Sequence, residues 1–338
     1  MPAPLAVSRW ITLCSLAVLA ACGGSGGGPG APAAPAVPPA PIPPAPATTL
    51  TVSVSSLALA ANIPAALPAA IPGNPRDITV ANTGTQPALA VTVDAALLPV
   101  GTVVSANTCV GALAAAASCT ITITPGTVVT TLPVTLTVRG NNTNTVSTNV
   151  EVLGYGSIYQ GGAVYSLDDT TPPAGSVGGK AMARFEALPG LWSPLPPLVV
   201  AADNLTDGAA NSAAILAAYS DPVAYPATTV AAKECDAYSD AGYSDWHVPA
   251  ICEMGYDQTG AGTGCGSSIA PLVQNVQSNL VDSNIVAGVP GEFWSSTQAG
   301  GPGTALVWAH RFEVANTYQV FDVKNSSRRL LCVRALTY

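Results

Sequence analysis

Apolar and polar residues alternate along residues 48–153, and threonine or serine fills many of the polar positions. The clearest runs are residues 49–55, 77–84, 89–93, 119–124 and 132–138. A period of two, rich in β-branched residues and broken by Gly, Asn or Pro, predicts half-buried antiparallel strands. About seven such strands in about 105 residues suit two sheets packed face to face. We therefore expect an all-β sandwich over residues 48–153.

Residues 154–338 follow a different pattern. Two alanine-rich stretches, residues 211–219 and 228–239, place their apolar side chains at helical spacing. The final third of the chain alternates again in short runs, which predicts short strands. We therefore expect a second domain over residues 154–338 that combines helices and strands in an α+β arrangement.

The first 47 residues show neither period. Arg9 precedes an apolar run from Trp10 to Ala21, which is typical of a secretory signal and, at ~1.5 Å per residue, is too short to span ~30 Å of hydrocarbon. Residues 22–47 are almost wholly Gly, Pro, Ala and Ser, a composition that cannot bury a core. We expect a signal peptide over residues 1–21 and a disordered N-terminal stalk over residues 22–47.

The signal ends in Leu19-Ala-Ala-Cys22, which resembles the lipobox of bacterial lipoproteins. The resemblance implies that the thiol of Cys22 is acylated, and two or more acyl chains are enough for stable anchoring. Gly23 after the cysteine is, by the same resemblance, compatible with sorting to the outer membrane. An ordinary signal with an incidental cysteine is the rival interpretation.

The charge of the chain limits the classes of partner that it can bind. Charged residues make up 9% of the chain, with 11 Lys and Arg against 19 Asp and Glu, and the net charge is -8. Binding to a phosphate backbone needs clustered cations, and the sequence shows no such cluster. We therefore expect no nucleic-acid partner.

Four segments of the C-terminal domain resemble one known family. They are Gly242-Tyr-Ser-Asp-Trp-His-Val-Pro249, Trp294-Ser-Ser-Thr297, Trp308-Ala-His-Arg-Phe312 and Cys332-Val-Arg334. In this order they resemble the Lcl C-terminal (DUF1566) family, whose fold is similar to C-type lectin-like domains and formylglycine-generating enzymes. The resemblance implies two helices packed on short twisted strands, with ligand-binding loops. It also implies a role in attachment, since several members bind glycosaminoglycans or other surfaces.

The cysteines fit these resemblances. Cys109 and Cys119 flank a segment that resembles a hairpin in the immunoglobulin-like domains of bacterial surface proteins, and in an oxidising compartment they should pair. A metal site at these two thiols is the weaker alternative, since no histidine lies near them in the sequence. The C-type lectin-like resemblance implies a long-range bridge between Cys235 and Cys332. Cys252 and Cys265 then remain for a local bridge.

No catalytic residue, metal ligand or cofactor site is expected. The two histidines, His247 and His310, each stand near a tryptophan, where imidazoles are usually structural. Formylglycine-generating enzymes use a pair of late cysteines, whereas Cys332 is the only late one here. The calcium-binding motifs of sugar-binding lectins, Glu-Pro-Asn or Gln-Pro-Asp and Trp-Asn-Asp, do not occur. We therefore expect a protein that is not an enzyme.

The best candidates for ligand binding lie near the C-terminus. Trp308 and Phe312 should point to one face of a strand and pack in the core. The opposite face and the adjoining loop offer Arg311, Glu313, Asn316, Tyr318, Gln319, Asn325, Ser326, Ser327 and Arg328. Such C-terminal segments also resemble the variable regions of proteins diversified by retroelements.

These observations predict a lipoprotein anchored in the outer membrane and displayed at the cell surface. Its lectin-like domain would bind a protein or glycan of a host or of the environment, in adhesion or recognition. The alternative is a structural envelope lipoprotein that faces the periplasm and displays no ligand.

Overall fold

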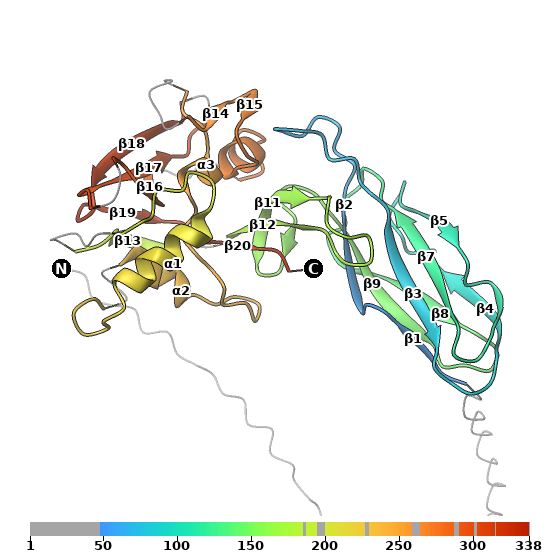
Figure 1. Cartoon of the computed structure of the whole chain (residues 1–338). Coiled ribbons are helices and arrows are strands. Elements are labelled where there is room, and N and C mark those ends of the chain that lie inside the picture. The colour runs from blue at the N-terminus through green and yellow to red at the C-terminus, as the bar shows by residue number, and fades with distance from the viewer. Residues whose placement is uncertain are drawn as a thin grey trace, which may run out of the picture. The chain divides into compact units, whose positions relative to one another are not determined.

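The computed structural model describes residues 48–184, 187–194, 200–226, 230–258, 264–286, 291–300, 303–314 and 316–337. These residues belong to one compact unit that is mostly β-sheet with a few short helices (Figure 1). Cys22 and the predicted stalk lie outside them. None of the helices within the described ranges has the length and apolar character needed to cross a membrane.

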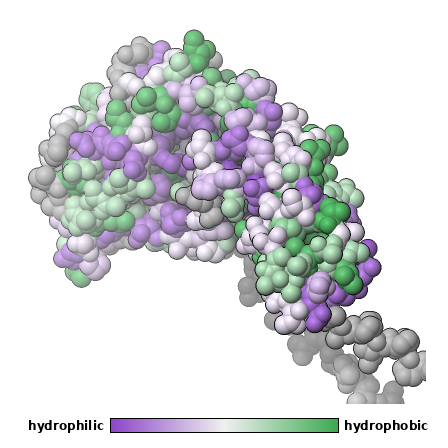
Figure 2. Space-filling model, turned by 45° about the vertical axis from the view of Figure 1, so that its right-hand side comes forward, coloured by the Kyte–Doolittle hydropathy of each residue, from purple (hydrophilic) through white to green (hydrophobic). Residues whose placement is uncertain are grey.

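Residues 48–153 form two sheets. The strands are β1 Leu50–Val52, β2 Ser56–Ala60, β3 Arg76–Asn82, β4 Ala88–Asp94, β5 Val103–Asn107, β6 Gly111–Leu113, β7 Ser118–Thr124, β8 Val134–Arg139 and β9 Val146–Leu153. One sheet has the order β1-β3-β7-β5 and the other β2-β9-β8-β4-β6. We call this part the two-sheet region. Several large hydrophobic side chains of the two-sheet region are exposed. In the view of Figure 2, hydrophilic residues lie on the surface of the described residues that follow this region.

The predicted alternation sets the core of the two-sheet region. In β3 and β7, alternate residues such as Ile78, Val80, Ile121 and Ile123 are fully buried, while their neighbours are partly exposed. Their side chains join those of the second sheet in one hydrophobic cluster. One pairing differs from the expected antiparallel pattern, because β2 and β9 run parallel. Parallel neighbours need a long connection, and here the chain from β3 to β8 provides it.

Residues 154–337 contain the helices and three further sheets. The elements are β10 Ile158–Tyr159, β11 Gly162–Asp168, β12 Gly178–Ala183, β13 Ala187–Leu191, α1 Gly208–Ala218, α2 Ala231–Asp236, α3 Ile251–Met254, β14 Gly266–Ser267, β15 Ala270–Pro271, the π-helical η2 Gln277–Val281, β16 Glu292–Gln298, β17 Leu306–Arg311, β18 Tyr318–Val323, β19 Ser327–Leu330 and β20 Val333–Ala335. The sheet orders are β10-β11-β12-β20, β13-β19-β16-β17-β18 and β14-β15. Helix α1 agrees with the predicted helix over residues 211–219, and α2 is shorter than the predicted 228–239.

Core residues pack on both faces of the five-stranded sheet β13-β19-β16-β17-β18. Trp294 and Leu330 belong to a core cluster that includes Ile215 of α1 and residues of α2. Phe293 and Leu331, their immediate neighbours in sequence, belong to a second cluster with α3 and η2. Successive side chains of a strand point to opposite faces, so one short run of residues can supply both cores.

Arg76 of β3 joins the two-sheet region to the chain that follows. Its side chain is 1% exposed, and Nη1 donates to the carbonyl oxygens of Pro172 and Gly175 at 2.9 Å each. Nη2 lies 3.4 Å from the Asp169 carboxylate. A shared cluster of buried apolar residues lies beside this contact, including Ala58 and Ala60 of β2, Val164 and Leu167 of β11, and Val177. The junction therefore combines an apolar core with a buried ion pair.

The three predicted cysteine pairs are confirmed. Sulfur atoms lie at bonding distance in Cys109–Cys119, Cys235–Cys332 and Cys252–Cys265. The second pair links α2 to the residue just before β20 and so closes most of the second half of the chain.

Loss of the long-range disulfide should cost more stability than loss of the short one. In the entropy model, closing the 97-residue separation of Cys235–Cys332 contributes about 4–5 kcal/mol and closing the 10-residue separation of Cys109–Cys119 about 3 kcal/mol. We expect the Cys235→Ser/Cys332→Ser variant to lower the denaturant midpoint reported by tryptophan fluorescence. The tryptophans beyond the signal segment all lie after residue 190, so they report on this part. An equal shift in Cys109→Ser/Cys119→Ser would contradict the expectation.

Candidate functional site

Three of the predicted ligand residues meet at one end of the five-stranded sheet. Arg311 of β17 pairs with Tyr318 of β18 on one side and with Glu292 of β16 on the other. The parallel pairing of β16 with β19 brings Glu292 beside Arg328, and the two side chains form an ion pair. Arg328, Glu292, Arg311 and Tyr318 thus stand side by side across four strands, and we call them the charged row.

Hydrogen bonds connect the members of the charged row. The Tyr318 hydroxyl donates to Glu292 Oε1 at 2.9 Å and accepts from Arg311 Nη1 at 3.1 Å. Arg328 also contacts Asp322 of β18, with Nη2 at 2.8 Å from Oδ2. Glu292 therefore lies between two arginines and a phenol, and the chain fixes all four side chains without a ligand.

Aromatic rings support both guanidinium groups. Arg328 Cζ lies 5.2 Å from the ring centre of Trp294, and Arg311 Cζ lies 5.5 Å from that of Tyr318. Such contacts hold a guanidinium plane in place while its edge stays available. The Arg328 side chain is only 17% exposed, and burial lowers the pKa of its guanidinium. Its buried Nε has no hydrogen-bond partner among the described residues.

A cavity of about 340 Å³ opens at the charged row. Its lining consists of Gly291, Glu292, Arg311, Ser327, Arg328 and Arg329. Three arginines and one carboxylate line the cavity, and two further carboxylates adjoin it, since Glu313 pairs with Arg311 and Asp322 with Arg328. Guanidinium groups present paired N–H donors that match carboxylate, sulfate and phosphate oxygens. The arrangement therefore suits an anionic group on a ligand.

No family model matches this chain, and no curated protein matches it. What the charged row can bind follows from its own residues.

The other predicted ligand residues fall into two groups. Glu313 and Asn316 lie beside the charged row, where Glu313 Oε2 is 3.1 Å from Arg311 Nε and accepts from Asn316 Nδ2 at 3.4 Å. Asn325 and Ser326 lie in the turn between β18 and β19, and Ser327, the first residue of β19, lines the cavity. These residues remain at or near the surface.

Gln319 was wrongly placed at the ligand surface. It is 6% exposed, and its Nε2 donates to the carbonyl of Gly255 at 3.0 Å. Strand alternation explains the error, because Tyr318 and its neighbour Gln319 point to opposite faces of β18. Gln319 instead satisfies a carbonyl at the end of α3.

Sequence reasoning missed Glu292, Asp322 and Arg329. Glu292 directly precedes the Phe293-Trp-Ser-Ser motif, and Arg329 follows Arg328. Because the chain has so few charged residues, an acid or a base at the end of a predicted strand could have indicated these site residues. The pairing of β16 with both β17 and β19 is not local in sequence, and this pairing brings the charges together.

The tryptophans near the site differ in burial. Trp294 is fully buried, and Phe312 is 3% exposed, as core packing predicts. Trp308 is partly exposed and meets Phe321 edge-on with ring centres 5.5 Å apart. Phe321 itself is 58% exposed, so an aromatic pair reaches the surface on the face opposite the charged row.

Both histidines are buried. His310 is fully enclosed, with Nε2 at 3.0 Å from the Thr317 hydroxyl and its ring 4.6 Å from Phe312, and burial lowers the pKa of its imidazole to about 3. Burial also lowers the pKa of His247, whose Nε2 has no partner among the described residues. Within those residues, no group of three or more His, Cys, Asp and Glu side chains could hold a metal ion.

His310 should make the protein sensitive to acid. Its pKa of about 3 in the folded state lies below the ordinary 6.5, so the unfolded chain binds a proton first as the pH falls. The stability associated with neutral His310 is therefore complete above pH 6.5 and is lost between pH 6.5 and about 3. We expect the wild type to lose about 2 kcal/mol more than His310→Gln between about pH 7 and about pH 5. Urea unfolding at both pH values measures this, and parallel losses would contradict it.

Proposed function

We propose that this protein is a lipid-anchored binding protein of the outer membrane, displayed at the cell surface, that recognises an anionic group on a protein or glycan. The observation that carries the proposal is the cavity at the charged row, which Arg311, Arg328 and Arg329 line together with Glu292. Its task would be adhesion or recognition, and no chemical step is required of it.

The electrostatics of the cavity support an anionic ligand. Three arginines bring guanidinium N–H donors to one cavity, where Arg328 pairs with Glu292 and Asp322 and Arg311 pairs with Glu313. The Arg311 side chain is 40% exposed, so a ligand oxygen can reach its guanidinium from solvent. The fixed positions of Arg311 and Arg328 lower the entropy lost when a ligand binds.

The sequence resemblances support the setting of this site. The Leu19-Ala-Ala-Cys22 segment resembles a lipobox, and the Gly- and Pro-rich stretch after it would lift the folded part away from the membrane. Two sheets around one core agree with an immunoglobulin-like sandwich. The long-range Cys235–Cys332 bridge and the helices packed on a central sheet agree with the C-type lectin-like fold of the Lcl C-terminal family.

Removing cations from the cavity should weaken binding to a sulfated glycan. The probes are a heparin hexasaccharide and the same hexasaccharide without sulfate, titrated calorimetrically into the full chain. We expect only the sulfated form to bind, and Arg311→Gln/Arg329→Gln to weaken it by roughly tenfold or more, because charge-assisted hydrogen bonds are lost. Added salt should weaken binding in the wild type more than in the variant.

The control is Arg139→Gln, which removes one positive charge, against two in the cavity variant. Arg139 ends β8 in the two-sheet region and is exposed, so this variant changes the net charge without touching the cavity. It should bind the sulfated probe like the wild type. Equal binding of both probes, or an equal loss in the control, would argue against recognition at the charged row.

Surface display can be tested separately by protease treatment of intact cells. We expect loss of the folded part, detected with an antibody to residues 154–338, while a periplasmic marker stays intact. Cys22→Ser should release the protein from the membrane fraction, because the acylated atom is removed. Survival of the chain in intact cells, with cleavage only after lysis, would favour the alternative of a structural envelope lipoprotein that faces the periplasm.

A further inference from the structure

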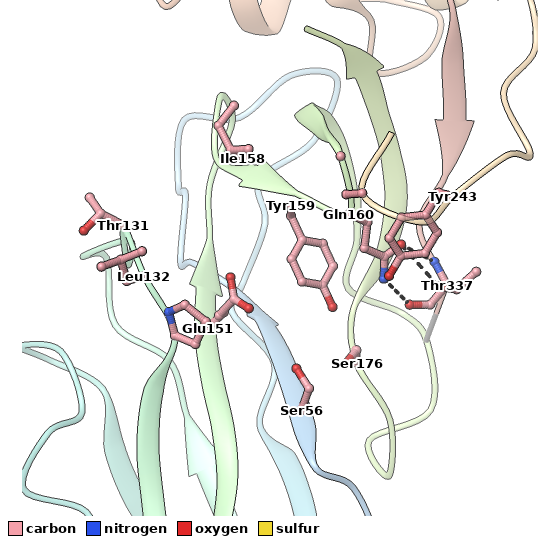
Figure 3. A pocket seen from close by; sticks show the side chains of 13 residues that line it. Ser56, Thr131, Leu132, Glu151, Ile158, Tyr159, Gln160, Ser176, Tyr243 and Thr337 are labelled. Carbon is pink, nitrogen blue, oxygen red and sulfur yellow. Dashed lines mark hydrogen bonds between the residues drawn. The ribbon is translucent and has the colours of Figure 1, made fainter. Parts of the chain in front are cut away.

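A second cavity lies at the junction of the two-sheet region with β10 and β11. It has a volume of about 710 Å³, within the range of pockets that hold small ligands. Glu151 of β9, Tyr159 of β10 and Tyr243 contribute side chains to it, and the hydroxyls of Ser56 and Ser176 lie along one side (Figure 3). We call it the Glu151 cavity. The Arg76 contact and the shared apolar cluster hold its two walls together.

Among the described residues that line this cavity, Glu151 is the only charged one. Its side chain is partly buried, and desolvation raises the pKa of the carboxyl group. No hydrogen bond or ion pair joins its carboxylate to another described residue. The carboxylate therefore loses part of its hydration and gains no donor from the chain in return, which is an unfavourable state for a charged group.

The cation behind Tyr243 already has a partner. Arg334 lies behind Tyr243, 4.0 Å from its ring centre, and Asp245 binds Arg334 Nε at 2.6 Å and Nη2 at 3.0 Å. Gln160 is also committed, since its Oε1 accepts from Arg334 Nη1 at 2.6 Å and from the Thr337 amide at 3.0 Å. Neither Arg334 nor Gln160 therefore pairs with the Glu151 carboxylate.

The side chain of Tyr159 lies beside Glu151, with the edge of its ring toward the carboxylate (Figure 3). Desolvation raises the pKa of the phenol, and the nearby charge of Glu151 adds to this. A carboxylate beside an aromatic ring is a combination that attracts organic cations, because the carboxylate and the face of the ring both present negative potential. Leu132 and Ile158 at the rim are 74% and 56% exposed and offer apolar surface to an alkyl chain.

We propose that the Glu151 cavity binds the ammonium or guanidinium group of a ligand, with Glu151 as counter-ion and Tyr159 as aromatic wall. The alkyl part of the ligand lies against Leu132 and Ile158. A neutral sugar is less favoured, because its hydroxyls would leave the charge of Glu151 uncompensated and find Gln160 already bonded. This site is separate from the charged row and takes a ligand group of opposite charge.

The test uses two small probes that differ only in charge. N-acetyl-lysine methylamide carries an ammonium group at the end of its side chain, and N-acetyl-norleucine methylamide ends in a methyl group. Both are titrated into the full chain and followed by saturation-transfer NMR. We expect saturable binding of the lysine probe and at least about tenfold weaker binding of the norleucine probe, the difference that a charge-assisted hydrogen bond gives. Binding should weaken as the pH falls through the raised pKa of Glu151.

Three variants test whether Glu151 binds the ammonium group of the lysine probe. Glu151→Gln keeps the shape and removes the charge, so it should lose about tenfold in affinity for the lysine probe. Tyr159→Leu should weaken binding less, and Asp94→Asn should leave it unchanged. Asp94 is an exposed carboxylate of β4 outside the cavity, so its variant has the same net charge as Glu151→Gln. Undetectable binding of the lysine probe, equal affinity for the two probes, or equal loss in Asp94→Asn would overturn the proposal.

Discussion

Three buried charges of this protein are each matched by an opposite charge, and these pairs fix much of its architecture. Arg76 meets Asp169 at the junction, Lys180 meets the 1% exposed Glu253, and the fully buried Arg334 meets Asp245. Each pair joins segments far apart in sequence. Removing one partner would leave an uncompensated buried charge, which usually costs about 3–5 kcal/mol. The pairs therefore restrict how the sheets can be arranged, even where they add little net stability.

At the two proposed sites, charged groups remain open to a ligand. At the charged row the Arg311 side chain is 40% exposed and lines the cavity with two further arginines, so a ligand oxygen can reach its guanidinium. In the Glu151 cavity a carboxylate has no cation among the lining residues. Because charged residues are only 9% of the chain, an unmatched charge that is also partly desolvated is informative here. An exposed unmatched charge elsewhere would be hydrated and would indicate nothing.

Local patterns made part of the structure predictable from sequence. The period-two runs located β3 and β7, the alanine-rich spacing located α1, and the cysteine pairs agreed with the resemblances. The charged row was only half predictable. Arg311 and Arg328 were identified by residue type, whereas Glu292 joins them through strand pairing that no local pattern encodes. Gln319 was misassigned because one position along a strand reverses the face. The Glu151 cavity depends on a parallel pairing and a junction that only the folded chain shows.

Aromatic rings help to hold two buried cations inside the fold. Lys324 is fully buried and has its Nζ 4.6 Å from the ring centre of Trp192 and bound to Gln298, and burial lowers the pKa of its amine to about 8. Arg334 lies on Tyr243 in a similar way. In both cases an aromatic face and an oxygen acceptor hold a cation that the chain itself supplies. Tyr159 and Glu151 likewise combine an aromatic ring with an oxygen acceptor, but they line an open cavity. The interactions that hold Lys324 and Arg334 inside the fold can therefore bind a cation from solvent at that position.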